Sequence, residues 1–101
     1  PPEPATHHPK PETMKTITLK AAIQAAFTTC GHTPRTLKHK VTGQITVDCP
    51  GTRVEVIIHR QPGGDVAAVL AIYPSALPLA NALVAHLTDQ GFPTTLDTLT
   101  H

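Results

Sequence analysis

Apolar residues follow a helical spacing near the start of the chain. Between Leu19 and Phe27 they recur three or four positions apart, as on one buried face of a helix. Thr18 is a suitable N-cap, and Gly31 is a suitable residue to end the helix in a left-handed conformation. We therefore expect a first helix between Thr18 and Gly31.

The same spacing returns towards the end of the chain. Leu83 and Leu87 belong to a leucine stripe that is preceded by Ser75 and followed by Gly91. Ser75 predicts the N-cap of a second helix, and Gly91 predicts its end. Pro78 fits this prediction because the first turn of a helix tolerates a missing N–H group.

Between the two helices the pattern changes to an alternation of apolar and polar residues. It runs over residues 43–49 and 53–59, as is typical of strands with one buried face, and an uncharged apolar run follows at residues 66–73. Turn-forming residues separate the three segments, at 49–52 and at 61–65. The two alternating segments and the apolar run therefore predict three strands that are connected by two tight turns.

The two turns predict a strand register. The first hairpin would place Val47 opposite Val54, and the second would place Val56 opposite Leu70. In this register the apolar row continues across all three strands, whereas a slip of one residue would expose it. We therefore expect one face of the sheet to be buried by the helices.

These elements predict an α+β fold, a two-layer sandwich of the order α-β-β-β-α. Both helices would cover one face of a three-stranded antiparallel sheet, and residues 94–99 are a candidate fourth strand. We expect a single domain over residues 14–101. Residues 1–13 hold five of the eleven prolines and no large apolar residue. We therefore expect a disordered Pro-rich tail or linker there.

Composition is consistent with one small domain. The chain has 101 residues, of which 40% are hydrophobic, and it contains no apolar run of about 18 residues, so we expect no membrane-spanning helix. The predicted topology places Cys30 and Cys49 too far apart for a disulfide. Two free thiols favour a reducing compartment, and we expect a cytoplasmic protein.

The second face of the predicted sheet is partly apolar. Ile57 and Val69 would face each other across neighbouring strands, with Tyr73 beside them and with Arg53 and Glu55 around them. Either the C-terminal residues cover this face or it meets a partner. Our leading hypothesis is a small interaction module that binds another protein, or a second copy of itself, through these five residues.

Charge is distributed unevenly along the chain and suggests an alternative function. Residues 15–60 carry seven Lys and Arg residues against two carboxylates, whereas residues 61–101 carry only three aspartates. The predicted topology gathers residues 32–40 and 59–60 at one basic pole. The alternative hypothesis is therefore a nucleic-acid-binding accessory module, since clustered cations bind phosphates. Its candidate residues are Arg35, Lys38, His39, Lys40 and Arg60.

No catalytic constellation is recognisable in the sequence. Ser75 follows a strand and precedes a helix, but the glycines of a nucleophile elbow are missing around it. Cys30, His32, His39 and His59 match no standard zinc-binding spacing. We therefore expect no enzymatic activity, no cofactor and no bound metal.

Overall fold

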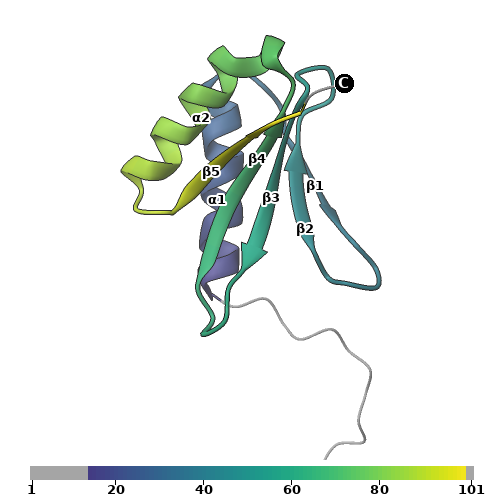
Figure 1. The fold of residues 1–101 in the computed structure, drawn as a ribbon, viewed down its shortest axis with the longest axis vertical. Coiled ribbons are helices and arrows are strands. Elements are labelled where there is room, and N and C mark those ends of the chain that lie inside the picture. The colour runs from purple at the N-terminus through teal and green to yellow at the C-terminus, as the bar shows by residue number, and fades with distance from the viewer. Residues whose placement is uncertain (1–13, 100–101) are drawn as a thin grey trace, which may run out of the picture.

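The computed structural model of the chain describes residues 14–99, so the expected Pro-rich tail at residues 1–13 lies outside the described residues. The elements are arranged in two layers, a sheet and a pair of helices, which confirms the predicted α+β class (Figure 1). In chain order they are α1 (Met14–Thr29), β1 (Arg35–Lys38), β2 (Ile45–Asp48), β3 (Val54–Arg60), β4 (Val66–Ile72), the short 3-10 helix η1 (Pro74–Ala76), α2 (Leu77–Asp89) and β5 (Thr94–Thr98).

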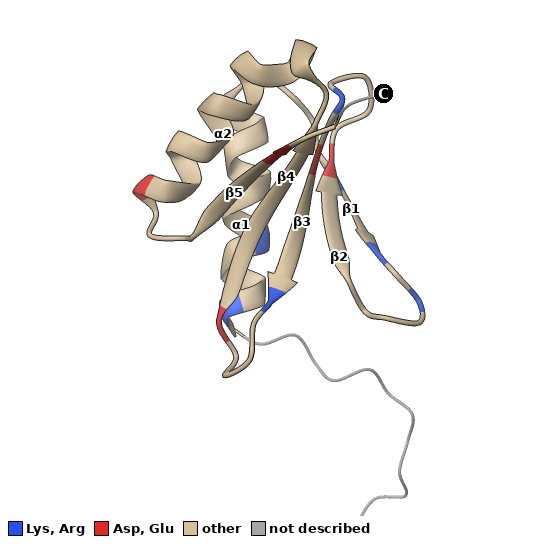
Figure 2. Ribbon diagram, in the orientation of Figure 1, with Lys and Arg blue, Asp and Glu red and all other residues tan. Residues whose placement is uncertain are grey.

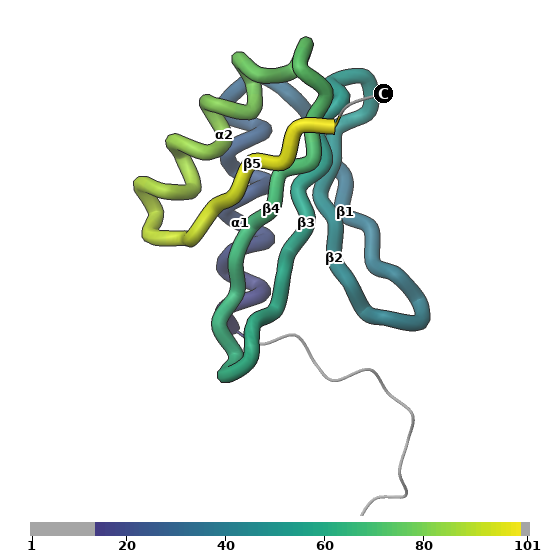
Figure 3. Tube along the Cα trace, in the orientation of Figure 1, coloured from purple at the N-terminus to yellow at the C-terminus, as the bar shows by residue number. Residues whose placement is uncertain are grey.

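Both helices lie on the same side of the sheet, as the sequence predicts. The helix α1 packs over β2, β3 and β4, whereas α2 packs over β4 and β5 and also contacts α1. The Cα trace in Figure 3 shows the strands side by side, with α1 behind β4 and α2 beside β5. One face of the sheet is therefore covered by helices, and the other faces away from them.

The sheet differs from the predicted three, or at most four, antiparallel strands. It has five strands in the order β1-β2-β3-β4-β5, and it is mixed because β5 pairs with β4 in parallel. The helix α2 returns the chain to the end of the sheet where β4 begins, which makes β5 run in the direction of β4. β1 was not predicted, because its four residues are all exposed and show no alternation of burial.

The predicted register is confirmed in one hairpin and wrong in the other. Val56 lies opposite Leu70, as predicted for β3 and β4. Val47, however, lies opposite Val56 and not opposite Val54. The pairing is shifted by two residues because the loop before β3 extends through Arg53, which adopts a left-handed φ of 60°. A shift of two keeps every apolar side chain on the same face.

The helix starts also differ from the prediction, whereas the helix ends agree with it. Thr18 lies inside α1 and donates its hydroxyl to the Met14 carbonyl at 2.8 Å instead of capping the helix. Ser75 belongs to η1, and no side chain caps α2. Gly31 and Gly91 follow the helices with φ of 87° each, and the N–H of the next residue reaches back five positions, as in a Schellman motif.

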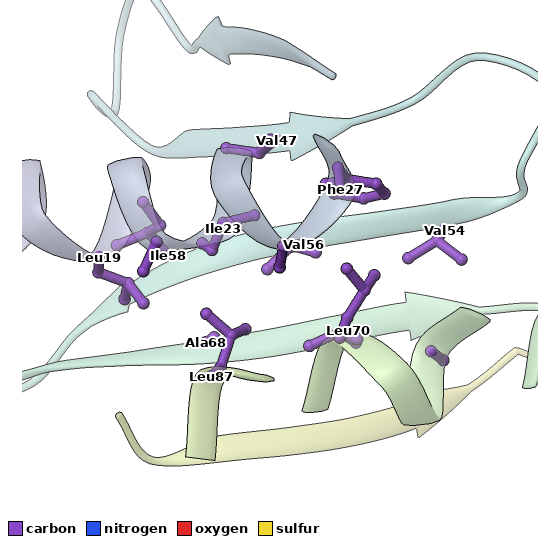
Figure 4. Close-up of a cluster of buried hydrophobic side chains, with 14 of the residues drawn as sticks. Leu19, Ile23, Phe27, Val47, Val54, Val56, Ile58, Ala68, Leu70 and Leu87 are labelled. Carbon is purple, nitrogen blue, oxygen red and sulfur yellow. The ribbon is translucent and has the colours of Figure 1, made fainter. Parts of the chain in front are cut away.

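The hydrophobic core lies between the helices and the covered face of the sheet. Leu19, Ile23 and Phe27 from α1 are fully buried, and so are Val56 and Leu70 from the two central strands. Figure 4 shows the helix side chains directed towards the strand side chains. This packing accounts for the alternation in the sequence, since every second residue of β2 and β3 points into it.

Candidate functional site

The candidate site is the sheet face that points away from both helices, which we call the open face. Ile57 lies between Val56 and Ile58, which are both buried in the core. Successive side chains of a strand point to opposite faces, so Ile57 points away from the helices. It faces Val69 on β4. The structure therefore places the two predicted central residues side by side on the open face.

A row of three apolar side chains and two threonines, which we call the apolar row, crosses the open face from one edge of the sheet to the other. Ile57 and Val69 are half-buried by their neighbours in the sheet, and Leu37 is 46% exposed. Strand β5 extends the sheet beyond β4 and so does not lie over these side chains. The row consists, strand by strand, of Leu37, Thr46, Ile57, Val69 and Thr95.

A charged row lies next to the apolar row, two residues along each strand. It contains three carboxylates and one cation, and its members are Arg35, Asp48, Glu55, Ala71 and Asp97. Arg35 binds the Asp48 carboxylate with two nitrogens, at 2.8 and 3.2 Å. The hydrogen bond and the negative charge of Asp48 raise the pKa of Arg35. After this pairing, Glu55 and Asp97 give the row its acidic character.

Arg53 and Tyr73 form one corner of the open face. The guanidinium carbon of Arg53 lies 5.7 Å from the centre of the Tyr73 ring, a distance suited to a cation–π interaction. The Tyr73 N–H donates to the Arg53 carbonyl at 3.4 Å. All five residues predicted for partner binding therefore belong to this corner or to the two rows beside it.

The backbone of Arg53 provides a test of this corner. A left-handed φ costs a residue with a side chain about 1 kcal/mol or more, whereas glycine adopts it freely. We expect Arg53→Gly to be more stable than Arg53→Ala by about 1 kcal/mol, because both lose the contact with Tyr73 but only glycine relieves the strain. Urea unfolding of the two variants measures the difference. Equal stability would show that the corner does not hold position 53 in this conformation.

The structure gathers most, but not all, of the residues predicted for the basic pole. Lys38 lies at the level of Ile45 on β2, beside the end of β3, which Arg60 closes. His39 and Lys40 follow Lys38 in the connecting turn. Figure 2 shows Lys and Arg residues at this end of the molecule. Arg35 lies towards the other end, because β1, which was not predicted, carries the chain along the sheet between positions 35 and 38.

Lys15 and Asp65 pair near the same end of the sheet. The Lys15 ammonium donates to the Asp65 carboxylate, which joins the first turn of α1 to the loop between β3 and β4. This hydrogen bond, together with the positive charge of Lys15, lowers the pKa of Asp65. The pair is exposed, so it contributes little to stability.

Titration of Asp65 tests this contact. We expect Lys15→Met to raise the pKa of Asp65 towards its ordinary value, as measured by NMR of the side-chain carboxyl. Since the folded pKa is below the unfolded one, the contribution to stability is present above the unfolded pKa and is lost as the pH falls through the folded one. The wild type should therefore lose its small advantage over Lys15→Met in strong acid. An advantage unchanged by acid would contradict the contact.

Two shallow hollows flank the apolar row on the open face. One, of about 400 Å³, is lined by Leu37, Lys38, His39, Gln44, Thr46 and Glu55. The other, of about 230 Å³, lies beside Arg53 and Tyr73 and is bordered by Leu99. Both are open to solvent, so they are shallow depressions in a broad surface and not an enclosed pocket for a small molecule.

Within residues 14–99, no group of three or more His, Cys, Asp or Glu side chains is placed to hold a metal ion. Cys30 and Cys49 are both free, and the Cys49 thiol donates to the Thr33 carbonyl at 3.3 Å. Neither helix in this range has the length and apolar character to cross a membrane.

Sequence reasoning missed two parts of the open face. Leu37 and the Arg35–Asp48 pair escaped notice because β1 has no burial pattern. Asp97 belongs to the charged row only because β5 joins β4 in parallel. Comparisons with models of protein families, with curated proteins and with solved structures found no match to this chain.

Proposed function

We propose that this chain is a small, non-enzymatic interaction module that binds a protein through the open face. The observation that carries the proposal is the apolar row at Leu37, Ile57 and Val69, which neither helix nor β5 covers. An apolar patch bordered by charged residues is typical of a protein-binding surface. The partner is either another protein or a second copy of the chain.

The surrounding residues support a protein as partner rather than a small molecule. Apolar side chains at the centre of such a surface supply binding energy, and polar residues at its border supply orientation. Here Arg53 and Tyr73 stand at the border, and both residue types are enriched among the residues that dominate binding energy. Two free cysteines agree with the cytoplasmic location that we propose for the module.

A capture experiment tests the open face as a binding surface. The amount of protein that the immobilised wild-type chain retains is compared with the amount that two immobilised variants retain. Val69→Lys places a charge in the apolar row, and Ala85→Lys places a charge on the exposed side of α2. We expect bound protein, including added copies of the chain, to be retained by the wild type and by Ala85→Lys. Val69→Lys should lose at least about tenfold in binding, since a charge at the centre of an interface costs more than 1.4 kcal/mol. If Val69→Lys retained as much protein as the wild type, the proposal would be refuted.

A second candidate function is nucleic-acid binding at the basic end of the sheet, where Lys38, His39, Lys40 and Arg60 are gathered. Arg35 contributes less to this candidate, since it is paired with Asp48. Phosphate binding should weaken steeply as salt rises. Fluorescence anisotropy with labelled duplex and single strands, for the wild type and Arg60→Ala, tests it. Absence of binding at low salt would exclude it.

A further inference from the structure

We propose that the basic end of the sheet binds the surface of an anionic lipid bilayer. The inference goes beyond the proposed function, since it concerns one end of the strands and not the open face. Two features carry it: an excess of cations, and exposed apolar side chains among these cations. Clustered cations are attracted to anionic headgroups, and apolar side chains beside them enter the boundary between headgroups and acyl chains.

Cations from two strands lie at this end on the side of the helices. Lys38 faces Ile45 across the β1–β2 pair, and Arg60 faces Val66 across the β3–β4 pair. Ile45 and Val66 are buried, and residues that face each other point to the same side of a sheet. Lys38 and Arg60 therefore point towards the layer that contains α1. Lys40 follows Lys38 in the turn between β1 and β2.

The first half of α1 adds two more cations to the same end. Figure 4 shows Leu19 beside Ile58, and Ile58 lies level with Lys38 across the sheet. Lys20 follows Leu19 in α1, so it lies near the level of Lys38. Lys15 lies further towards this end, in the first turn of the helix. Three separate segments of the chain therefore bring their cations to one end.

Carboxylates are scarce at the basic end. Asp65 is the one carboxylate that the described residues place there, and it is paired with Lys15. The other carboxylates within residues 14–99 lie in the charged row or at the end of α2. Figure 2 shows this separation of the two signs of charge. The cations that outnumber Asp65 at the basic end are Lys15, Lys20, Lys38, Lys40 and Arg60.

Large apolar side chains are exposed among these cations. Val41 follows Lys40 in the turn between β1 and β2 and is 88% exposed. Met14 precedes Lys15 at the start of α1 and is 75% exposed. Figure 1 shows this turn and the start of α1 at the same end of the molecule. The two most exposed large apolar residues of the described range therefore lie where the cations gather.

These apolar side chains favour a bilayer over nucleic acid as the partner. The phosphates of a nucleic acid attract cations but gain nothing from an exposed valine, and single-stranded bases stack on aromatic rings. Neither the turn at residues 39–44 nor the first turn of α1 contains an aromatic residue. At a bilayer surface, by contrast, cations bind the headgroups while apolar side chains leave water.

Binding of this kind should be weak and reversible. Each cation near an anionic surface strengthens binding roughly fivefold, and salt screens this attraction. Two apolar side chains bury less surface than an acyl chain, which by itself gives only reversible binding. We therefore expect half of the chain to be bound at roughly 1 mM accessible lipid.

Co-sedimentation of the full chain with lipid vesicles at low salt measures this binding. We expect the chain to bind vesicles of phosphatidylcholine that contain about 30% phosphatidylserine, and not to bind vesicles of phosphatidylcholine alone. Lys40→Ala should bind about fivefold more weakly than the wild type. Its matched control is Asn81→Glu, which lowers the net charge by the same amount on the exposed side of α2 and should bind like the wild type.

A second pair of variants tests the apolar contribution. Val41→Ser should bind the same vesicles at least about threefold more weakly, because it removes an apolar side chain from the contact. Leu77→Ser is the matched control, since Leu77 is 37% exposed at the start of α2. The start of α2 follows the end of β4, at the opposite end of the sheet. We therefore expect Leu77→Ser to bind like the wild type.

A tryptophan reporter tests which part of the chain enters the bilayer. The chain contains no tryptophan, so a single introduced residue reports only on its own surroundings. We expect the fluorescence emission of Val41→Trp to shift to shorter wavelength when vesicles with phosphatidylserine are added. The emission of Leu77→Trp should stay unchanged.

Each outcome decides for or against the bilayer. Binding that requires phosphatidylserine, weakens with salt and shifts the emission of Val41→Trp alone supports the inference. Absence of binding to these vesicles at low salt overturns it, and so does binding that Val41→Ser or Lys40→Ala leaves unchanged. If labelled DNA binds while the vesicles do not, nucleic acid is the partner of the basic end and the bilayer is excluded.

Discussion

Phe27→Ala is expected to lower the free energy of unfolding by about 3 to 5 kcal/mol. Phe27 is fully buried and is the largest side chain of the core. It projects from α1 towards the central strands (Figure 4). Truncation removes the contacts of a whole ring and leaves a cavity that the surrounding strands can close only in part. Since small domains are stable by about 5 to 15 kcal/mol, this one change removes much of the total.

Phe92→Ala is the matched control for this prediction. Phe92 is only partly buried and lies at the border of the core after α2. The same truncation should therefore cost clearly less there, because water already reaches part of the ring. Urea unfolding followed by circular dichroism gives both values. A loss below about 1 kcal/mol for Phe27→Ala would contradict the packing of α1 on the sheet.

A carboxylate is expected to destabilise the chain by very different amounts at two neighbouring positions of β3. Val56 is fully buried under the helices, whereas Ile57 is half-buried on the open face. Val56→Glu buries a charge without a partner, which costs several kcal/mol, and we expect most of the chain to be unfolded. Ile57→Glu leaves the charge in water, so we expect a folded chain that is about 1 kcal/mol less stable.

Amide spectra and thermal unfolding of the two variants separate these outcomes. The Val56→Glu spectrum should collapse to the narrow dispersion of an unfolded chain. The Ile57→Glu spectrum should keep the wild-type dispersion, with changes limited to the residues near position 57. If Ile57→Glu unfolded the chain as well, part of the protein would have to cover Ile57, and the open face would not exist.

The sequence predicted those parts of the fold that depend on local patterns. The Pro62-Gly63-Gly64 turn restricts the hairpin geometry, and the β3–β4 register followed correctly from it. Gly31 and Gly91 marked both helix ends, since a left-handed residue is needed there. The central residues of the open face followed from the same alternation, because Ile57 and Val69 have buried residues on both sides.

Long-range pairing decided the parts that could not be predicted. Strand β1 is held at the edge of the sheet by the Arg35–Asp48 pair and by a bond from Gln24 on α1 to Thr36, at 2.7 Å. Neither contact leaves a periodic signal in the sequence. The parallel direction of β5 depends on how α2 crosses the sheet. Because β1 was not predicted, the sequence could not show that Arg35 lies apart from the other cations of the predicted basic pole.

The most direct test of the open face is methyl NMR of the full chain, alone and with the protein that it retains in the capture experiment. We expect the resonances of Leu37, Ile57 and Val69 to move when this protein is added, because these side chains meet the partner. The resonances of Val56 and Leu70 should stay in place, since the core is the same in both states. Open-face resonances that do not move when the partner is added, or that move no more than those of the core, would contradict binding through this face.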